Sequence, residues 1–399
     1  MQLPEAFITR TKVLLGNEWD AFEQALNQKP PISIRLNPQK AGKEALANFE
    51  VESLVSWASN AYYLSARPVF TLDPLFHAGC YYVQEASSMF LEHFIKNYIH
   101  EPVKALDLCA APGGKSTHLS ATLPEGSLLV ANEVIRSRAN ILSENLIKWG
   151  NPNTIVTNNH PKDIGKLKTF FDLIVCDLPC SGEGMFRKDP VAISEWSVNN
   201  VKRCAERQRQ IINDIFPALK PGGILIYSTC TYNREENEDN IDWICKTFET
   251  ELLEEPRRFM PHKTRGEGFF IAGFRKAGEG YKVQGEGYRN KKKDFLFLKK
   301  SLKIVFAGIN LGEMRGKDLI PNHALAMSTV LSEKAYPRWE LDKETALKYL
   351  RKEALYDIPP AVPLGFVLAT YRNQPLGFIK NIGNRANNLY PQEWRIRKL

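Results

Sequence analysis

Residues 106–117, which read LDLCAAPGGKST, decide the fold expected for this chain. A short apolar strand, Ala105 to Cys109, runs into small residues and the pair Gly113-Gly114, and a helix follows. Small residues let the backbone come close to a ligand, and the helix N-terminus suits an anionic or carboxylate-bearing one. The stretch therefore predicts a ligand site at the carboxyl end of the strand. A glycine turn that only packs helix against strand would give the same pattern.

Strand-like and helix-like patterns alternate after this stretch, up to about residue 276. Helices are expected at Ile135–Trp149, capped by Gly150, and at Val201–Leu219, which ends in a Pro221-Gly222-Gly223 turn. This β-α-β-α order predicts an α/β fold with a mostly parallel, doubly wound sheet, whose ligands bind at the carboxyl ends of its strands. Four more short apolar strands are expected, at Ser127–Ala131, Thr154–Thr157, Asp172–Cys176 and Ile224–Ser228.

An acidic residue completes the expected cofactor site. Glu133 lies twenty residues beyond Gly113, at the end of the second strand, where a carboxylate can accept both ribose hydroxyl hydrogens. A P-loop needs a glycine at the position of Cys109, and a dinucleotide site needs G-x-G-x-x-G, so ATP, GTP and nicotinamide fit less well. S-adenosylmethionine requires a ribose acid and a small-residue turn but no pyrophosphate cradle, and it fits best.

Two of the seven cysteines lie at the carboxyl ends of expected strands. Cys180 follows Asp177 after one strand, and Cys230 follows the strand Ile224–Ser228. The other five have apolar or small neighbours or lie in helix patterns, so buried positions are expected for them. Either cysteine alone is as well explained by packing, but the pair beside a methyl-donor site predicts catalysis.

Methyl transfer to C5 of a pyrimidine explains why a nucleophilic thiol, an acid and a second group for resolution are needed. C5 is a poor nucleophile until a thiolate adds to C6 and turns the ring into an enamine. A base must later remove the C5 proton, and an acid near N3 must neutralise charge on the ring. Asp177, Cys180 and Cys230 supply these residue types. An amino-group methyltransferase would carry an Asp/Asn-Pro-Pro-aromatic turn where residues 177–180 read DLPC.

These motifs resemble the Nol/Nop/Sun (Fmu) family of RNA 5-methylcytosine methyltransferases, which implies a Rossmann-like class I methyltransferase core. The matching blocks, in family order, are YYVQEASSM (81–89), CAAPGGKS (109–116), Glu133, DLPCSGEGMFRKDP (177–190) and STCTYNREENE (228–238). The Pro-Cys turn paired with a later Thr-Cys is specific, because DNA C5 methyltransferases carry only the Pro-Cys nucleophile.

The resemblance also implies roles for single residues. Cys230 would be the nucleophile at C6, and Cys180 would act later, in proton removal or product release. Asp177 would contact the cytosine ring or the cofactor, and Lys115 and Arg187 are further candidate polar contacts. The residues implied to bind S-adenosylmethionine are Cys109, Ala110, Ala111, Pro112, Gly113, Gly114, Lys115, Glu133, His160 and Asp177.

One position departs from the family pattern. The family usually places an aspartate after the third strand, near the adenine amino group, whereas residues 157–163 read TNNHPKD here. The adenine edge is therefore expected to meet one of Asn158, Asn159, His160 and Asp163.

Three domains are expected. Residues 1–75 predict a small α+β RNA-binding domain with amphipathic helices and a strand at Ile32–Leu36, and residues 76–276 predict the methyltransferase core. Residues 277–399 predict a C-terminal RNA-binding region that begins with a linker at 277–290. Its elements are a basic run from Lys291 to Lys303 whose alternating Phe295 and Phe297 suggest a strand, a helix around Thr345–Leu355, and a hairpin of Gly365–Tyr371 with Leu376–Ile379.

The end of the chain points to a substrate. Residues 376–397 are similar to the tail of bacterial small-subunit rRNA methyltransferases of the F type. This similarity implies a PUA-like RNA-binding end and a substrate in 16S rRNA near the decoding region, free or within the small subunit. A tRNA is the main rival substrate.

Composition sets wider limits. A chain of 399 residues with 43% hydrophobic and 25% charged residues is globular, not disordered, collagenous or a coiled coil. A net charge of +8 favours a polyanionic partner. Seven cysteines without C-x-x-C spacing argue against disulfides and a metal site. No long apolar run or signal-peptide pattern appears, so we expect a cytoplasmic monomer without membrane contact.

Two other functions stay open. A non-catalytic RNA-binding or ribosome-assembly factor could retain a methyltransferase fold, but it would have no need of both thiols. A nucleotide hydrolase is disfavoured by Cys109 at the P-loop glycine position.

Overall fold

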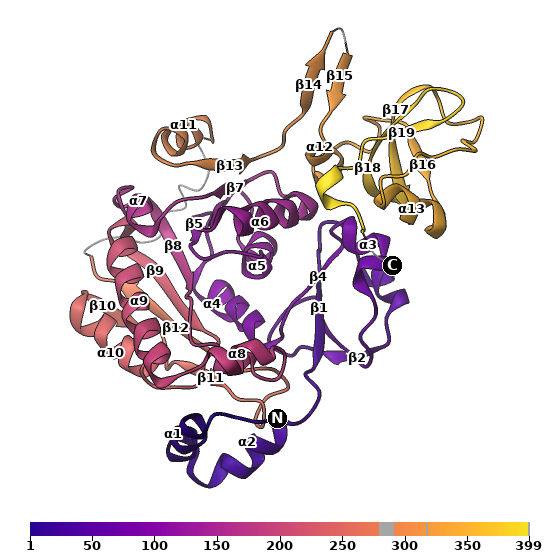
Figure 1. Cartoon of the computed structure of the whole chain (residues 1–399). Helices are drawn as coiled ribbons and strands as arrows, with labels where there is room; N and C mark the ends of the chain where they lie inside the picture. Colours follow the sequence, from indigo (N-terminus) through magenta and orange to yellow (C-terminus); the bar gives the residue numbers. More distant parts are fainter. Residues whose placement is uncertain (279–290, 317, 398–399) are drawn as a thin grey trace.

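A nine-stranded sheet forms the centre of the computed structural model, which describes residues 1–278, 291–316 and 318–397 (Figure 1). The strand order is β10-β12-β9-β8-β5-β6-β7-β13, with β11 paired to β12. Its five central strands are parallel: β5 (Lys104–Asp107), β6 (Leu128–Asn132), β7 (Thr154–Thr157), β8 (Phe171–Asp177) and β9 (Leu219–Thr229). The antiparallel strands are β10 (Thr250–Leu252), β11 (Arg257–Phe259), β12 (Phe269–Lys276) and β13 (Ile304–Ala307). The doubly wound α/β fold is confirmed.

Both faces of this sheet are covered by helices, because alternate strand residues point to opposite sides. In β8, Leu173 and Val175 pack on one side, and Ile174 and Cys176 pack on the other. The first face is covered by α4 (Leu91–Tyr98), α5 (Gly114–Thr122) and α6 (Arg136–Trp149), and the second by α7 (Pro161–Gly165), α9 (Val198–Ile215) and α10 (Glu238–Thr247).

The predicted core strands and helices are present, with two differences. Helix α9 spans Val198–Ile215 and ends before the predicted Leu219, because Leu219 already belongs to β9. Helix α6 ends at Trp149, and Gly150 adopts φ +88° as its left-handed cap. The predicted turn at Pro221-Gly222-Gly223 is wrong, because β9 begins at Leu219 and runs through these residues. The three residues lie where the pairing of β9 with β8 shifts its register, and Gly222 takes φ +71° there.

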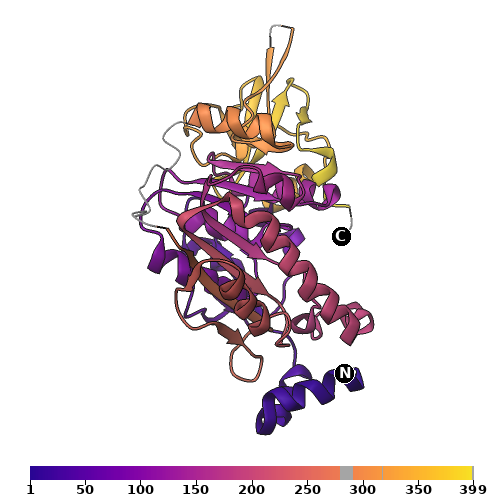
Figure 2. The ribbon, with the colours of Figure 1, turned by 90° about the vertical axis from the view of Figure 1, so that its left-hand side faces the viewer.

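The N-terminal region forms its own antiparallel sheet in the order β2-β3-β1-β4. Its strands are β1 (Ile32–Leu36), β2 (Val51–Leu54), β3 (Ala61–Leu64) and β4 (Tyr81–Val83), with the short helix α3 (Pro74–His77) before β4. Because β4 pairs with β1, this sheet extends past the boundary expected after residue 75. Helices α1 (Glu5–Leu15) and α2 (Trp19–Leu26) lie apart from it, at the bottom of Figures 1 and 2.

The basic run after residue 290 is a helix, α11 (Lys291–Ser301), and the predicted strand is wrong. Phe295, Leu298 and Leu302 recur at helical spacing and pack on the core, whereas the side chain of Phe297 is 44% exposed. Strand β13 then pairs with β7 at the sheet edge. The core therefore continues beyond the expected boundary at residue 276. Most of the expected linker, residues 279–290, lies outside the described residues.

The C-terminal region contains a hairpin, β14 (Gly312–Arg315) with β15 (Asp318–Pro321), which projects from the molecule (Figure 1). The predicted hairpin is confirmed as β17 (Gly365–Tyr371) with β18 (Gln374–Asn381), and its turn residues Arg372 and Asn373 take positive φ. The remaining elements are α12 (His323–Met327), β16 (Arg338–Glu340), α13 (Lys343–Leu350) and β19 (Ala386–Asn388). Helix α13 ends before the predicted Leu355.

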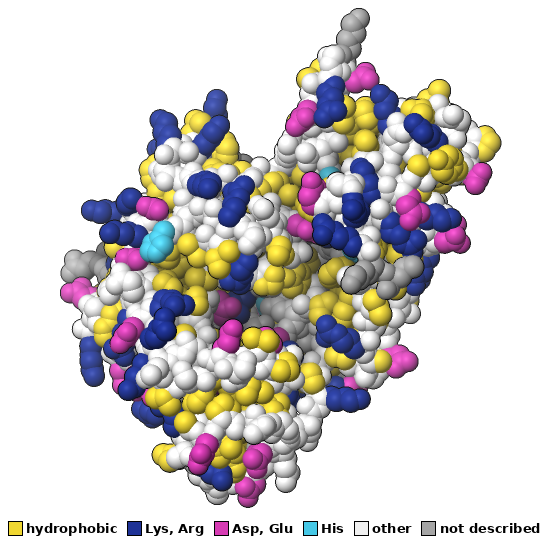
Figure 3. All heavy atoms as spheres, viewed as in Figure 1, with side chains coloured by type: hydrophobic (Ala, Val, Ile, Leu, Met, Phe, Trp, Pro, Cys, Tyr) yellow, Lys and Arg dark blue, Asp and Glu magenta, His cyan; other side chains and the backbone are white. Residues whose placement is uncertain are grey.

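The N-terminal sheet and the C-terminal region share one hydrophobic core. Ile34 and Tyr81 from the first belong to the same buried cluster as Trp339, Tyr349 and Tyr390 from the second. Between these regions and the methyltransferase core, the molecular surface is hollowed, and lysine and arginine side chains lie on both sides of the hollow (Figure 3). None of the helices in the described ranges has the length and apolar character needed to span a membrane.

Candidate functional site

The two cysteines singled out in the sequence meet in space. Cys180 Sγ and Cys230 Sγ lie 3.0 Å apart, after the carboxyl ends of the neighbouring strands β8 and β9, and both residues are half-buried. All seven cysteines are free thiols. The contact with Cys230 and, after it, burial raise the pKa of Cys180, so Cys180 keeps its proton. The two sulfurs are close enough for an S–H···S hydrogen bond in which either thiol can be the donor.

A buried carboxylate fixes the loop that carries Cys230. Glu183 Oε2 accepts hydrogen bonds from Thr231 Oγ1 at 2.6 Å and from the N–H groups of Tyr232 and Asn233 at 2.8 and 2.9 Å. Three donors on one oxygen hold the chain that follows Cys230 in one conformation. A shift of the backbone that follows Cys230 would have to break those bonds.

A second buried carboxylate holds the loop of Cys180. Glu236 accepts the N–H of Ser181 at 3.0 Å, and the side-chain amides of Gln208 and Asn233 each donate to it at 2.8 Å. Burial raises the pKa of Glu236. Because Asn233 also belongs to the Cys230 loop, the positions of the two thiols are coupled.

A cation lies between the thiol pair and the glycine turn. Lys115 Nζ forms an ion pair with Asp177 Oδ2 at 2.8 Å, and Ser228 Oγ donates to Asp177 Oδ1 at 2.8 Å. Burial disfavours the ammonium of Lys115, but the negative charges of Asp177, Asp107 and a Cys230 thiolate raise the Lys115 pKa overall. Lys115 therefore stays charged beside Asp177.

The glycine turn contains a buried acceptor that suits a ligand. Asp107 ends β5 and is fully buried; Ser116 Oγ donates to Asp107 Oδ2 at 2.6 Å, while Oδ1 has no partner among the described residues. Gly113 takes φ +119°, a conformation that a side chain would strain. A bound group with a hydrogen-bond donor, such as the amino group of S-adenosylmethionine, fits this turn.

Glu133 lies at the end of β6, as expected. Its Oε1 accepts the N–H of Ile135 at 2.9 Å, and Arg138 Nη1 lies 3.4 Å from Oε2. Arg138 also donates to the carbonyl of Ala111 in the glycine turn at 2.9 Å. The arginine thus links the acidic residue to the turn.

The residues considered for adenine lie after β7. The amides of Asn158 and Asn159 donate to backbone carbonyls. His160 is exposed and caps α7 through Nδ1, and Asp163 pairs with Lys166 at 2.7 Å.

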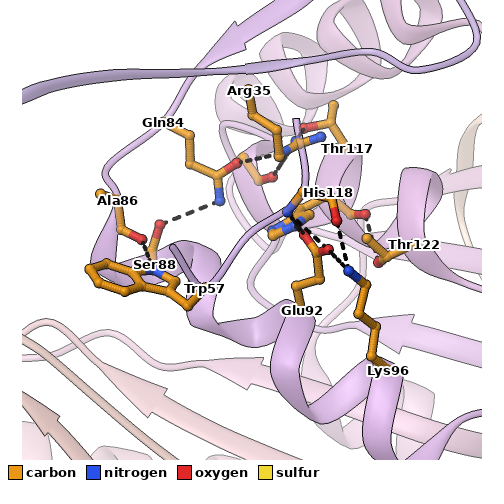
Figure 4. Close-up of polar contacts among 12 residues, drawn as sticks. Arg35, Trp57, Gln84, Ala86, Ser88, Glu92, Lys96, Thr117, His118 and Thr122 are labelled. Atoms are coloured by element: carbon orange, nitrogen blue, oxygen red, sulfur yellow. Dashed lines mark hydrogen bonds and ion pairs between the residues drawn. The ribbon is translucent and has the colours of Figure 1, made fainter. Parts of the chain in front are cut away.

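Arg35, which sequence analysis missed, crosses from the N-terminal sheet to helix α5 (Figure 4). Its Nε donates to Gln84 Oε1 at 3.0 Å, and its Nη2 donates to Thr117 Oγ1 at 2.8 Å and lies 3.4 Å from the carbonyl of Gly114. Its guanidinium lies 4.8 Å from the ring centre of Trp149. Arg35 is 2% exposed, and burial lowers its pKa to about 9. The N-terminal sheet therefore helps to hold the glycine turn.

Known proteins match this chain over nearly its whole length. A family model for 16S rRNA methyltransferase RsmB/F matches residues 98–275, and models for the N-terminal and PUA domains of RsmF match residues 3–86 and 336–396. Curated proteins named ribosomal RNA small subunit methyltransferase F, from Salmonella heidelberg and Salmonella paratyphi A, are 30% identical over 98% of this chain and 96% of their own length.

The chain belongs to the RsmF family of methyltransferases. S-adenosylmethionine is accordingly its cofactor. A solved methyltransferase homolog from Pyrococcus horikoshii is 30% identical and superimposes with a TM-score of 0.60 over 68% of this chain and 95% of its own. NSun6 from the same organism, at 21% identity and a TM-score of 0.60, shares the fold over 69% of this chain and 99% of its own.

Some site features of this RsmF-family protein were not predicted. Glu183 and Glu236 lie inside the motif blocks at 177–190 and 228–238. Their acidic side chains next to the two cysteine turns were the only signal in the sequence that could have indicated their role. Arg187, expected at the site, instead forms a buried ion pair with Glu267 at 2.8 Å. Cys245, expected to be buried, is exposed, because Ile241 and Ile244 form the inward face of α10. Within the described ranges, no group of three or more His, Cys, Asp or Glu could hold a metal ion.

Proposed function

We propose that this methyltransferase transfers a methyl group to C5 of a cytosine in 16S rRNA, near the decoding region, through a covalent bond between Cys230 and C6. The observation that carries the proposal is the thiol pair, whose sulfurs lie 3.0 Å apart beside the glycine turn. Transfer to an amino group needs neither thiol, whereas transfer to C5 needs a thiol nucleophile, and the second thiol supplies a group for the later removal of the C5 proton. The names of the curated relatives support the choice of RNA.

The first step forms a bond between Cys230 Sγ and C6 of the cytosine. Lys115, held by Asp177, stabilises the attacking thiolate. The resulting enamine carries electron density to C5, which takes the methyl group that S-adenosylmethionine supplies, and S-adenosylhomocysteine is the leaving group. Asp177 would contact the cytosine ring, where charge develops during the attack. The base must leave its stack for this attack, because C6 is inaccessible within a helix.

The second step uses Cys180. The contact with Cys230 raises the pKa of Cys180, and that contribution ends when Cys230 is bonded to carbon. Cys180 then loses its proton to solvent more readily, and its thiolate takes the C5 proton. The electron pair of the C5–H bond reforms the C5–C6 double bond, and Cys230 leaves C6 as a thiolate.

The cofactor contacts are part of the same proposal. The turn from Cys109 through Ala110, Ala111, Pro112 and Gly113 to Gly114 would hold the methionine part, with Asp107 as acceptor for its amino group. Glu133 would accept the ribose hydroxyls, and His160 would contact the adenine edge.

The decisive experiment measures transfer of labelled methyl from S-adenosylmethionine to unmodified small subunits, naked 16S rRNA and bulk tRNA. Nucleoside analysis is expected to find the label in 5-methylcytosine from 16S rRNA. Label in tRNA alone would assign the other substrate class. Label in another nucleoside would overturn the C5 chemistry, and cofactor binding without label in any RNA would favour a binding factor.

Two variants separate the roles of the thiols. Cys230→Ala is expected to abolish transfer, because no bond to C6 can form. Cys180→Ala is expected to leave a protein–RNA adduct that survives a denaturing gel, because the C5 proton is not removed. Normal turnover by Cys230→Ala, or an adduct in that variant, would contradict the assignment.

A further inference from the structure

A groove lies between the N-terminal sheet and the methyltransferase core. It has a volume of about 820 Å³ and is lined by the chain before β1, the ends of β3 and β4, and residues 261–266. This volume lies at the upper end of the roughly 300–1,000 Å³ found for ligand sites. None of the cofactor-turn residues or the two site cysteines lines it, so the groove is separate from the cofactor site.

Exposed cations surround this groove. Lys29, Arg67, Lys188 and Arg265 are all exposed, and Lys29 and Arg67 form no ion pair among the described residues. The two lining carboxylates are already engaged. Glu52 pairs with Arg265, and Glu85 accepts backbone N–H groups from Ser87, Ser88 and Glu267. The groove therefore carries uncompensated positive charge.

The groove is joined to the thiol pair by a short piece of chain. Gly266 lines the groove, and two residues later Gly268 packs against Gly184 so closely that a Cβ on Gly184 would lie 2.5 Å from the Gly268 carbonyl oxygen. The same Cβ would lie 2.9 Å from the carbonyl oxygen of Cys230. Arg187, another lining residue, donates to the Gly266 carbonyl at 2.6 Å and fixes this connection.

The groove also borders the support of the cofactor turn. Gln84 lines it and accepts the hydrogen bond from Arg35, whose guanidinium reaches Gly114 and Thr117. A ligand in the groove would thus lie beside both the thiol pair and the support of the cofactor turn.

We propose that this groove binds the sugar–phosphate backbone of the RNA strand next to the target cytosine. The inference rests on the proposed function, which requires that a cytosine leaves its stack and that its neighbours are held nearby. The described lining contains no aromatic side chain for base stacking, but it offers cations for phosphates and Ser65, Thr264 and Gln28 for 2′-hydroxyl groups. Such contacts position the strand without reading its sequence.

The test uses the full-length protein with Lys29→Gln and Arg67→Gln, singly and together. Binding of naked 16S rRNA is measured between roughly 50 and 300 mM KCl, the range over which counterion release changes the affinity most clearly. In a plot of the logarithm of the RNA association constant against the logarithm of the salt concentration, each lost phosphate contact makes the negative slope shallower by about 0.7. The slope of the double variant is therefore expected to be shallower by roughly 1.4. Lys246→Gln, an exposed lysine on α10 outside the groove, is the matched control and should keep the wild-type slope.

The outcomes separate this inference from the proposed function. If wild-type protein forms 5-methylcytosine while the double variant keeps its RNA affinity and salt slope, the groove proposal fails and the function stands. Unchanged binding to naked RNA with weaker binding to intact small subunits would assign the groove to a ribosomal protein and overturn the RNA contact. Binding of S-adenosylmethionine should be equal in all variants, because neither cation contacts the cofactor turn.

Discussion

Asp107 shows how one buried carboxyl group links the cofactor site to the stability of the fold. Burial raises the pKa of Asp107 to about 7, from 3.8 for an ordinary aspartate. Between these two pH values the folded protein holds a proton that the unfolded chain has released. The stabilising contribution is therefore complete below about pH 4 and is lost as the pH rises through 7.

Asp107→Asn is expected to remove this pH dependence, because an amide does not titrate. The difference in the free energy of unfolding between wild type and variant should fall from pH 4 to pH 8, by at most about 4 kcal/mol at 1.36 kcal/mol per pKa unit. Denaturant titrations at several pH values measure it. A difference that stays constant with pH would contradict the assignment to Asp107.

For single residues, the sequence predicted the site residues that belong to motifs, and it missed those that reach the site from distant parts of the chain. Cys180, Cys230 and Asp177 could be placed together because the carboxyl ends of parallel strands share one edge of the sheet. Arg35 lies 79 positions before Gly114, and no local pattern connects the two. The buried ion pair of Arg187 likewise depends on a residue 80 positions away.

At the scale of elements, strand β1 holds the start of helix α5 through the hydrogen bonds of Arg35. Arg35→Lys keeps the charge but loses the planar fork that reaches Gln84 and Thr117 together. The dissociation constant for S-adenosylmethionine should rise roughly tenfold, as expected for a lost charge-assisted hydrogen bond of about 1.5 kcal/mol. Turnover at saturating cofactor should change much less.

Calorimetric titration with S-adenosylmethionine measures this effect, and Arg10→Lys is the control. Arg10 is a half-exposed arginine of the same N-terminal region that pairs with Glu235. Equal cofactor affinity in wild type and Arg35→Lys would show that β1 supports the fold without positioning the turn.

Elements with a strong period were predicted well, and elements decided by tertiary contacts were not. The five parallel strands and helix α6 follow from apolar runs and a glycine cap. For α11, the alternation of Phe295 and Phe297 suggested a strand, but the packing of Leu298 and Leu302 on the core decided for a helix. The strand β13 could not be foreseen, because its partner β7 lies far away in the sequence.

At the scale of the whole molecule, a buried histidine in the C-terminal region makes the stability of the folded chain sensitive to acid. His323 on α12 is buried against the rings of Tyr390 and Trp394, and burial lowers its pKa to about 3. Neither ring nitrogen has a partner in the described chain. The stability gained from the neutral ring is present above pH 6.5 and is lost as the pH falls towards 3.

His323→Phe is expected to keep the aromatic packing and to remove this sensitivity. Wild type should lose about 2 kcal/mol more than the variant between pH 6.5 and pH 5. Thermal unfolding across this range measures the difference. Parallel curves for the two proteins would locate the acid sensitivity elsewhere.

The core shared by the two ends of the chain has a consequence for biosynthesis. Tyr81 leaves the translating ribosome long before Tyr390, yet both side chains are buried in one cluster. At about 5–20 residues per second, the N-terminal sheet waits roughly 15–60 s for its partner. During that interval its apolar face is open to chaperones. A nonsense mutation late in the reading frame would therefore leave the first-made sheet uncovered.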